Sequence, residues 1–236
     1  MITASHEAPS RASFILASQG DNIKISTIGS RAWLIEAPGD FDLPAQRRIW
    51  SLAVALRARD DIESLIPGVT NLLVLFRQTP ADYDATFALL VAAWEQAQAV
   101  HPQGKLIEIP VIYGGEHATD LDAVCQHTGL SPREVIRRHS EGCYTVFSLG
   151  SAPGFGYLHG LDPSLATPRK KVPSLNMLKG TVTIGGAQTG ISALTGPNGW
   201  NAIGFAELTL FDPQAENPAL MAPGDSVRFL PERIEL

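Results

Sequence analysis

GGAQTG at residues 185–190 and PGFGYL at residues 153–158 are two glycine-rich turns that organise the second half of this 236-residue chain. Each turn lies beside a strand-like run, and glycine permits positive φ and the close approach of a ligand or another strand. Gln188 offers hydrogen-bond donors and acceptors, whereas Tyr157 offers a flat apolar wall. The two turns are therefore interpreted either as the lips of one small polar pocket or as ordinary corners of a β-barrel.

The sequence around these turns is typical of an all-β unit. Short strand-like runs alternate with clusters of glycine and proline, a pattern that predicts a closed barrel or a sandwich. The preceding run, residues 106–113, contains Pro110, which predicts an edge strand or a bulge because proline cannot donate to a ladder. The further predicted strands are 144–149, 181–184, 200–205, 208–211 and 226–230.

Two short helices are predicted between the first of these strands and the others. Asp120 is expected to begin the first helix and Gly129 to close it, since glycine readily takes the left-handed conformation that ends helices. Ser131 and Glu134 form a capping box at the start of the second helix, which is expected to end near His139.

Residues 21–103 show a different pattern, with elements in the order β-β-α-β-β-α. This order predicts an α+β fold in which a four-stranded sheet carries two helices on one face. The turn-rich residues 101–105 predict a domain boundary, so that the second domain is 104–236, and residues 1–20 are predicted to be a flexible leader. The predicted strands are 23–28, 32–35, 62–66 and 71–76, and the predicted helices are 43–59 and 79–97.

The composition limits the classes of partner. A net charge of −6 argues against nucleic acid or an anionic membrane surface as the main partner. No apolar run approaches the length of a membrane span. The two cysteines, Cys125 and Cys143, do not make a disulfide framework, which favours a cytoplasmic protein.

Several familiar sites are missing from the sequence. It contains no Gly-x-x-x-x-Gly-Lys-Ser/Thr motif, so no ATP site is predicted in this chain. Its histidines have no metal-ligand spacing, and no metal site is predicted.

Five residues remain as candidates, each with two interpretations. His139 could be a general base near neutral pH or a cation at a helix C-terminus. Arg169 could hold a carboxylate in a bidentate fork or lie solvated in a loop. Glu116 and Asp120 could form a carboxylate pair, or Asp120 could only cap a helix. Trp200 could be barrel core or a platform for a ligand.

Taken together, these motifs resemble the KipI-like family, also called allophanate hydrolase subunit 1 or the 5-oxoprolinase B subunit. The resemblance extends over roughly residues 23–232 and includes many motifs in the same order. The matching segments include PVIYGGE (110–116), GLS (129–131), PGFGYL (153–158), TPR (167–169), GGAQTGI (185–191), GW (199–200), LFDP (210–213) and PGD (223–225).

The resemblance implies an N-terminal α+β domain followed by a cyclophilin-like closed β-barrel. It also implies a homologous second subunit (the C-type chain, similar to allophanate hydrolase subunit 2) and a lactam-utilisation-type subunit, with ATP bound by another chain. Such complexes open 5-oxoproline to glutamate, and related modules in urea amidolyases form a carboxyltransferase that works with biotin. The founding member instead inhibits a sporulation histidine kinase. The expected function is therefore a subunit of an ATP-dependent hydrolase complex acting on a small cyclic amide, with a kinase regulator or a non-catalytic ligand-binding paralogue as alternatives.

This chain departs from the family pattern at several positions. Ser151 replaces an expected phenylalanine, and Thr70, Ser174 and Phe205 replace three expected arginines. Because serine and phenylalanine cannot replace a bidentate guanidinium, the departures predict either a less anionic ligand or lost catalysis.

The site expected for an enzyme subunit follows from residue chemistry. Gln188, Thr189 and the backbone of the glycine turn would hold a carbonyl, Arg169 would hold a carboxylate, and His139 would relay a proton. The predicted catalytic residues are His139, Arg169 and Gln188, and the predicted substrate-binding residues are Pro153, Gly154, Phe155, Tyr157, Gly186, Thr189 and Gly190.

Overall fold

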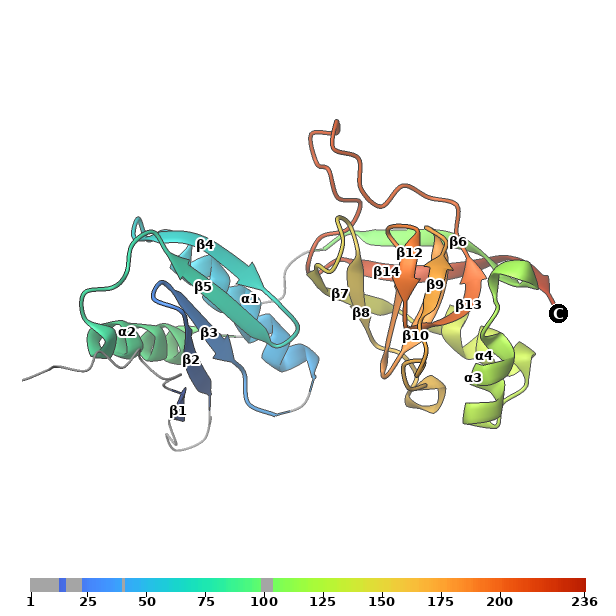
Figure 1. Ribbon diagram of the computed structural model, residues 1–236, viewed down its shortest axis with the longest axis horizontal. Coiled ribbons are helices and arrows are strands. Elements are labelled where there is room, and N and C mark those ends of the chain that lie inside the picture. The colour runs from blue at the N-terminus through green and yellow to red at the C-terminus, as the bar shows by residue number, and fades with distance from the viewer. Residues whose placement is uncertain (1–12, 16–22, 40, 99–103) are drawn as a thin grey trace, which may run out of the picture. The chain divides into compact units, whose positions relative to one another are not determined.

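The structure is a computed structural model that describes residues 13–15, 23–39, 41–98 and 104–236. The chain divides into two compact units, residues 1–101 and 102–236 (Figure 1). The boundary expected from the sequence lies two residues further on. The predicted α+β class with a closed barrel is confirmed.

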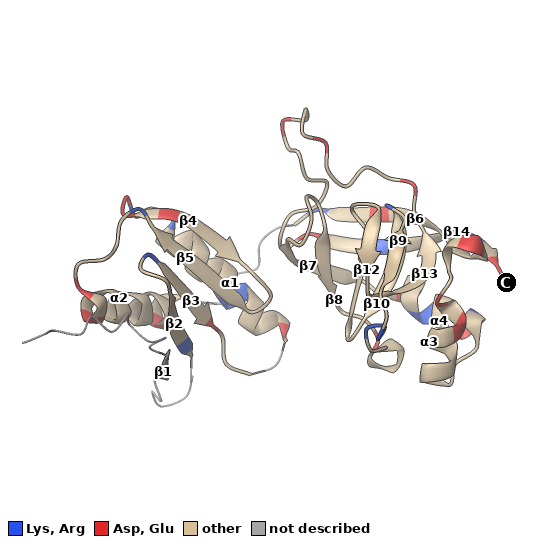
Figure 2. Ribbon diagram, viewed as in Figure 1, with Lys and Arg blue, Asp and Glu red and all other residues tan. Residues whose placement is uncertain are grey.

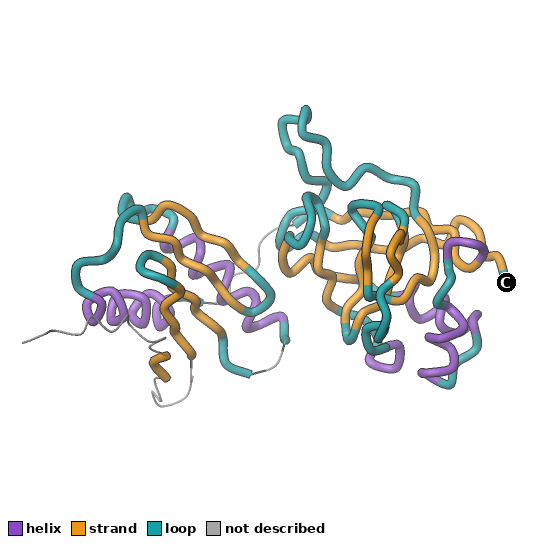
Figure 3. The backbone as a smooth tube through the Cα atoms, viewed as in Figure 1, coloured by secondary structure: helices purple, strands orange, loops and turns teal. Residues whose placement is uncertain are grey.

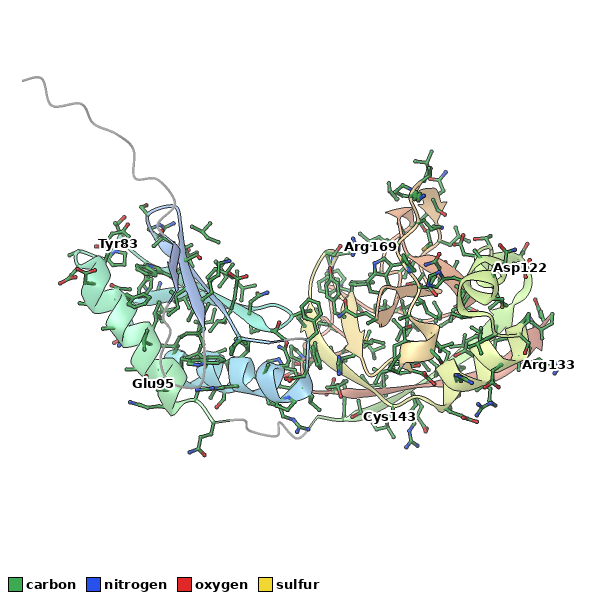
Figure 4. The ribbon with its side chains drawn as sticks, turned by 90° about the horizontal axis from the view of Figure 1, so that it is seen from below. Tyr83, Glu95, Asp122, Arg133, Cys143 and Arg169 are labelled. Atoms are coloured by element: carbon green, nitrogen blue, oxygen red, sulfur yellow. The ribbon has the colours of Figure 1, made fainter. Side chains whose placement is uncertain are left out.

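The first unit is a five-stranded sheet with the strand order β1-β2-β3-β5-β4 and antiparallel neighbours throughout. Its two helices cover the same face of the sheet (Figure 4). The sequence predicted four strands, and the additional strand β1 lies within the predicted flexible leader, whose other residues lie outside the described part. The strands are β1 (Ser13–Ile15), β2 (Lys24–Ile28), β3 (Ala32–Glu36), β4 (Ile62–Pro67) and β5 (Asn71–Phe76), and the helices are α1 (Leu43–Leu56) and α2 (Tyr83–Gln96).

Alternation along the central strands explains why one sheet face is covered. Trp33 and Ile35 of β3 and Leu72 and Val74 of β5 are fully buried, while the residues between them are partly exposed. Both helices begin at an aspartate that caps them. Asp42 accepts a hydrogen bond from the Ala45 amide (2.7 Å), and Asp82 accepts one from the Ala85 amide (2.9 Å). With this cap α2 begins at Tyr83, four residues after the start of the predicted helix 79–97.

The second unit is a closed barrel with the strand order β10-β11-β8-β7-β14-β6-β13, completed by pairing of β10 with β13. Strands β6 and β14 are parallel, whereas the other neighbours are antiparallel. The barrel strands are β6 (Leu106–Gly114), β7 (Tyr144–Leu149), β8 (Gly156–His159), β10 (Thr181–Gly185), β11 (Gln188–Ile191), β13 (Asn201–Phe205) and β14 (Ser226–Glu235).

Smaller elements decorate the barrel. A two-stranded sheet pairs β9 with β12, and the connection from β13 to β14 is a long loop over residues 206–225 (Figure 3). The remaining elements are β9 (Ser174–Met177), β12 (Gly196–Asn198), α3 (Leu121–Thr128), α4 (Pro132–Glu141) and the 3₁₀ turns η1 (Gly115–His117) and η2 (Pro163–Leu165).

Two strand predictions are corrected by the barrel. Residues 208–211 belong to the long loop and make only an isolated bridge between Phe211 and Ala219. Of the two alternatives for Pro110, the edge strand is wrong, because β6 lies inside the closed barrel between β14 and β13. An irregularity does lie next to it, since the register of β14 on β6 shifts between Pro231 and Arg233. Proline is tolerated there because β13 pairs only with Ile112 and Tyr113, leaving the β13 side of Pro110 without a ladder partner.

Charge is distributed over both units. Figure 2 shows basic and acidic residues interspersed among the described elements rather than gathered on one basic face. None of the helices in the described part is sufficiently long and apolar to span a bilayer.

A buried glutamine ties α1 to the β4–β5 turn of the first unit. Gln46 is fully buried, donates to the Gly68 carbonyl (3.1 Å) and accepts from the Thr70 amide (2.6 Å). Thr70 has a φ of 54°, a left-handed conformation that is unusual for a β-branched residue. The hydrogen bonds of Gln46 therefore stabilise a turn whose backbone conformation is unfavourable for Thr70.

We predict that Gln46→Ala lowers the free energy of unfolding by about 2–3 kcal/mol, because it leaves the buried Thr70 amide without an acceptor. Val54→Ala on the same helix, where the side chain is 64% exposed, should change it by less than about 0.5 kcal/mol. Chemical denaturation measures both, and an equal loss in the two variants contradicts the prediction.

Candidate functional site

A cavity of about 380 Å³ opens on the barrel. Ser151, Ala152, Phe155 and Tyr157 form one part of its lining, and the segment Ser192–Trp200 forms another. Arg169 completes the lining. The first wall is the predicted one, but the second is the segment after β11 rather than the predicted glycine turn at residues 185–190.

Three aromatic rings form the apolar part of the cavity. Phe155 meets Tyr157 edge to face with ring centroids 5.0 Å apart, and it meets Trp200 at 5.7 Å. Tyr157 and Trp200 are 6.3 Å apart. Because each ring packs against the other two, the wall is fixed in shape and suits one face of a small flat ligand.

The glycine-rich turn supports this wall from outside the cavity. A Cβ atom on Gly185 would overlap the indole ring of Trp200, and one on Gly190 would lie 3.1 Å from the ring of Phe155. These glycines are therefore needed for close packing of aromatic rings on the backbone. The interpretation from the sequence was that a ligand approaches these glycines directly. In the structure, the rings of Trp200 and Phe155 occupy the space next to Gly185 and Gly190 instead.

Arg169 is the charged group of the cavity. Its side chain is exposed, and its guanidinium carbon lies 5.7 Å from the centroid of the Trp200 ring. Among the described residues no carboxylate forms an ion pair with it. A guanidinium beside an aromatic face, without a carboxylate partner of its own, is suited to bind the carboxylate of a ligand.

The polar side chains of the second wall are held by one another. Asn198 accepts a hydrogen bond from the Trp200 amide (2.8 Å) and donates to the Ser192 hydroxyl (3.1 Å). On the first wall, Ser151 has a φ of 67°, a conformation that costs free energy for a residue other than glycine. The cavity thus has an ordered polar wall, and a strained residue lies in the other wall at the position where the family is expected to have phenylalanine.

His139 lies in the barrel core and not in the lining of the cavity. It is completely buried, stacks on Phe229 with ring centroids 4.7 Å apart, and meets the Tyr113 hydroxyl through Nδ1 (2.7 Å) and the Thr189 hydroxyl through Nε2 (2.8 Å). Burial lowers the pKa of His139 to about 3. The imidazole is therefore neutral, and neither the proton relay nor the helix-capping cation expected from the sequence fits its surroundings.

The hydrogen bonds of Thr189 determine the tautomer of His139. The Thr189 hydroxyl donates its proton to the Thr183 carbonyl (2.9 Å), so it must accept from His139. Nε2 of His139 thus carries the hydrogen, and Nδ1 accepts from the Tyr113 hydroxyl. Thr189, predicted to bind substrate, is instead part of this buried chain.

The other predicted site residues also lie outside the cavity lining. Gln188 is half-buried on β11, where it pairs with Gly185. Gly186 bridges to Thr167, which brings the glycine turn next to the segment that carries Arg169. Gly154 packs against the backbone of Leu210, and Pro153 is exposed beside it. Of the ten predicted residues, the cavity thus gathers Phe155, Tyr157 and Arg169.

Asp120 and Glu116 do not form the carboxylate pair considered above. Glu116 is 87% exposed and lies 3.5 Å from the ring of His117. Asp120 makes no side-chain cap at the start of α3. Its carboxylate instead accepts from the Ala202 amide (2.9 Å) and from the Lys170 ammonium (2.7 Å).

Sequence reasoning missed the segment Ser192–Gly199, and it left Trp200 undecided. The available signal was the run Gly196-Pro197-Asn198-Gly199 directly before a tryptophan, which indicates a turn that presents an aromatic ring. Across the described residues there is no group of three or more histidine, cysteine or acidic side chains that could hold a metal ion.

Comparison with known proteins places this chain in a family. The family described as carboxyltransferase domain, subdomain C and D, matches residues 23–221. The chain belongs to that family. A curated relative from Escherichia coli O157:H7, named as the B subunit of 5-oxoprolinase, is 42% identical over 206 residues, which are 87% of this chain and 94% of that protein. A protein of the same name from Haemophilus influenzae is 38% identical over 91% of this chain and its own full length.

Solved structures share the fold of this carboxyltransferase-family chain. A conserved uncharacterized protein from Pyrococcus horikoshii is 37% identical, with a TM-score of 0.53 over 89% of this chain and 97% of its own. The urea amidolyase of Kluyveromyces lactis has a TM-score of 0.79 over 94% of this chain and 16% of its own, and at 20% identity it shows the fold alone. The family expected from the motifs is confirmed.

We predict that stability of this family member depends on pH through His139. Its pKa is about 3 when folded and about 6.5 when unfolded, so the stability that it contributes is complete above about pH 6.5 and is lost as pH falls toward 3. The free energy of unfolding should fall by up to about 1 kcal/mol per pH unit in that window, and His139→Gln should remove this slope. His127→Gln, which alters an exposed histidine, should retain it. Denaturation between pH 7 and 4 tests this, and equal slopes in all three proteins would refute it.

A second prediction concerns the aromatic wall. Gly185→Ala should displace the Trp200 ring and lower the free energy of unfolding by about 1–3 kcal/mol, because the methyl group overpacks the contact. Gly150→Ala, at a glycine with open space around its Cβ position, should leave Trp200 in place. The ¹H–¹⁵N signal of the Trp200 indole reports the displacement, and an unmoved signal in Gly185→Ala contradicts it.

Proposed function

We propose that this chain is the B-type subunit of an ATP-dependent 5-oxoprolinase complex and that the Arg169 cavity holds the substrate. The observation that carries the proposal is a guanidinium without an ion-pair partner in the described structure, set beside an aromatic wall in a small cavity. The two relatives named as B subunits of 5-oxoprolinase, which match this chain over 94% or more of their length, support the same reaction.

The chemistry of 5-oxoproline agrees with the cavity. The molecule is a small, nearly flat lactam with one carboxylate. Arg169 would hold the carboxylate through paired N–H donors, while the ring would lie against Trp200 and Phe155. Hydroxyl groups of Ser151 and Thr195, both in the lining, would be donors for the lactam carbonyl. In this arrangement the chain binds and orients the amide and restricts its contact with water.

The departures from the family pattern at Ser174 and Phe205 lie outside the cavity. Ser174 accepts a hydrogen bond from the Lys170 ammonium, and Phe205 packs against the ring of His117. The one arginine of the cavity, Arg169, matches the one carboxylate of 5-oxoproline.

The activation of the amide is assigned to other chains in this proposal. The sequence has no P-loop, so ATP would bind to a lactam-utilisation-type subunit, and a homologous C-type chain would complete the cavity. A proton relay would also come from a partner, since His139 is buried away from the cavity. A complex that consumes ATP in this way would work in the cytoplasm.

We predict that Arg169→Ala raises KM for 5-oxoproline by roughly 10- to 100-fold, the usual cost of losing a charge-assisted bidentate contact. The assay is ATP-dependent release of glutamate by the chain reconstituted with its C-type partner and the ATP-binding subunit. Arg133→Ala is the matched control, because Arg133 is also exposed and Figure 4 shows it well apart from Arg169. Absence of 5-oxoproline-dependent glutamate in the unaltered complex, or an unchanged KM in Arg169→Ala, would reject the proposal.

A further inference from the structure

The segment that carries Arg169 is fixed, on both sides of the arginine, to the two residues that flank Trp200. On one side, the Asn201 side-chain amide donates to the Pro168 carbonyl (2.9 Å). On the other, the Lys170 amide donates to the Gly199 carbonyl (2.7 Å). The backbones next to the guanidinium and next to the indole are thus hydrogen-bonded to one another, although Arg169 itself has no ion-pair partner among the described residues.

Lys170 adds an ion pair to this connection. Its ammonium lies 2.7 Å from the Asp120 carboxylate, and the two side chains are only 15% and 16% exposed. It also donates to the Ser174 hydroxyl at 2.5 Å. Lys170 is not in the lining of the cavity. Its ammonium group is paired within the protein and is not placed to contact a ligand in the cavity.

Asp120 is hydrogen-bonded to both chain segments, the one that carries Arg169 and the one that carries Trp200. The same carboxylate oxygen that receives Lys170 also accepts from the Ala202 amide (2.9 Å), and the Asp120 amide donates to the Ala202 carbonyl (3.1 Å). Ala202 is two residues after Trp200, and Lys170 is one residue after Arg169. One partly buried carboxylate therefore fixes both chain segments that meet in the cavity.

We propose that the Asp120–Lys170 ion pair positions the Arg169 guanidinium beside Trp200 and thereby determines the affinity of the cavity for a carboxylate. Asp120 and Lys170 are positioning residues that act through Arg169. The part that concerns affinity rests on the function proposed above, whereas the geometric part does not. The competing explanation is that the pair only stabilises the fold, as partly buried ion pairs often do when one partner is removed.

The geometric part is tested without substrate. Arg169→Ala removes the guanidinium from the Trp200 ring, and Lys170→Met should displace it. The ¹H–¹⁵N signal of the Trp200 indole should therefore shift in the same direction in both variants. Lys170→Arg keeps the charge and should restore the signal. Lys171→Met is the matched control, since Lys171 is the adjacent exposed lysine and no partner of it occurs in the described structure.

The affinity part is tested with the reconstituted complex and 5-oxoproline. Lys170→Met should raise KM roughly tenfold with kcat unchanged, as expected when binding common to ground and transition states is lost. In the Arg169→Ala background the same change should have no further effect on KM, because the residue that Lys170 positions is gone. Additive effects in the double variant would overturn the proposal.

The two tests separate the possible failures. A lowered melting temperature in Lys170→Met with an unmoved Trp200 signal and an unchanged KM would show that the pair only stabilises the fold. Absence of 5-oxoprolinase activity in the unaltered complex would reject the function proposed above, and the indole signal would still decide the geometry. Should Lys170→Met not fold, Asp120→Asn keeps an acceptor for the Ala202 amide while removing the charge, and the same outcomes apply to it.

Discussion

Contact between the Trp200 ring and the backbone of Gly185 is the constraint on which the barrel unit and its cavity both depend. The ring occupies the space that any larger residue at the end of β10 would fill. Trp200 directly precedes β13, the strand that closes the barrel against β10. The same residue is the centre of the aromatic wall and the neighbour of the Arg169 guanidinium. The same packing contact therefore lies next to the closure of the barrel and shapes the cavity, because close-packed interiors do not easily accommodate an added methyl group at such a point.

His139, which is buried, and Asp120, which is partly buried, show how the surroundings decide the role of a polar side chain. His139 is surrounded by hydroxyl groups and aromatic rings, and burial lowers its pKa to about 3. A neutral ring with both nitrogens hydrogen-bonded is a structural connector between Tyr113 and Thr189. Asp120 has a cation and a backbone amide as partners, so its charge is compensated where it lies. Asp120 connects the two segments that meet at the cavity. Its position directly before α3 in the sequence did not indicate this role.

Prediction from the sequence was accurate where a local rule decides the structure. Ser131 caps α4 as expected by accepting from the Glu134 amide, but the Glu134 carboxylate pairs with Arg137 and Arg138 and does not complete the predicted capping box. Gly129 ends α3 with a φ of 71°. The apolar runs 32–35 and 71–76 predicted β3 and β5 correctly, and burial alternates along both strands because one sheet face is covered. The errors occur where a distant segment competes with the local rule. Asp120 had the residue type of a helix cap, but Lys170 and Ala202 are its partners. Pro110 had the signature of an edge strand, but the pairing of β6 with β13 begins only beyond it.

By itself the sequence determined the fold class and the family, and it singled out the first aromatic wall and Arg169. Periodicity, turn glycines and ordered motifs are properties of neighbouring residues, so the chain displays them before it folds. Only the tertiary structure decided that Ser192–Trp200 is the second wall, that His139 and Thr189 are buried in the core, and that Asp120 connects to Lys170. Those outcomes depend on which side chains from distant segments meet when the barrel closes, and that meeting is fixed by packing and by the partners that buried polar groups require.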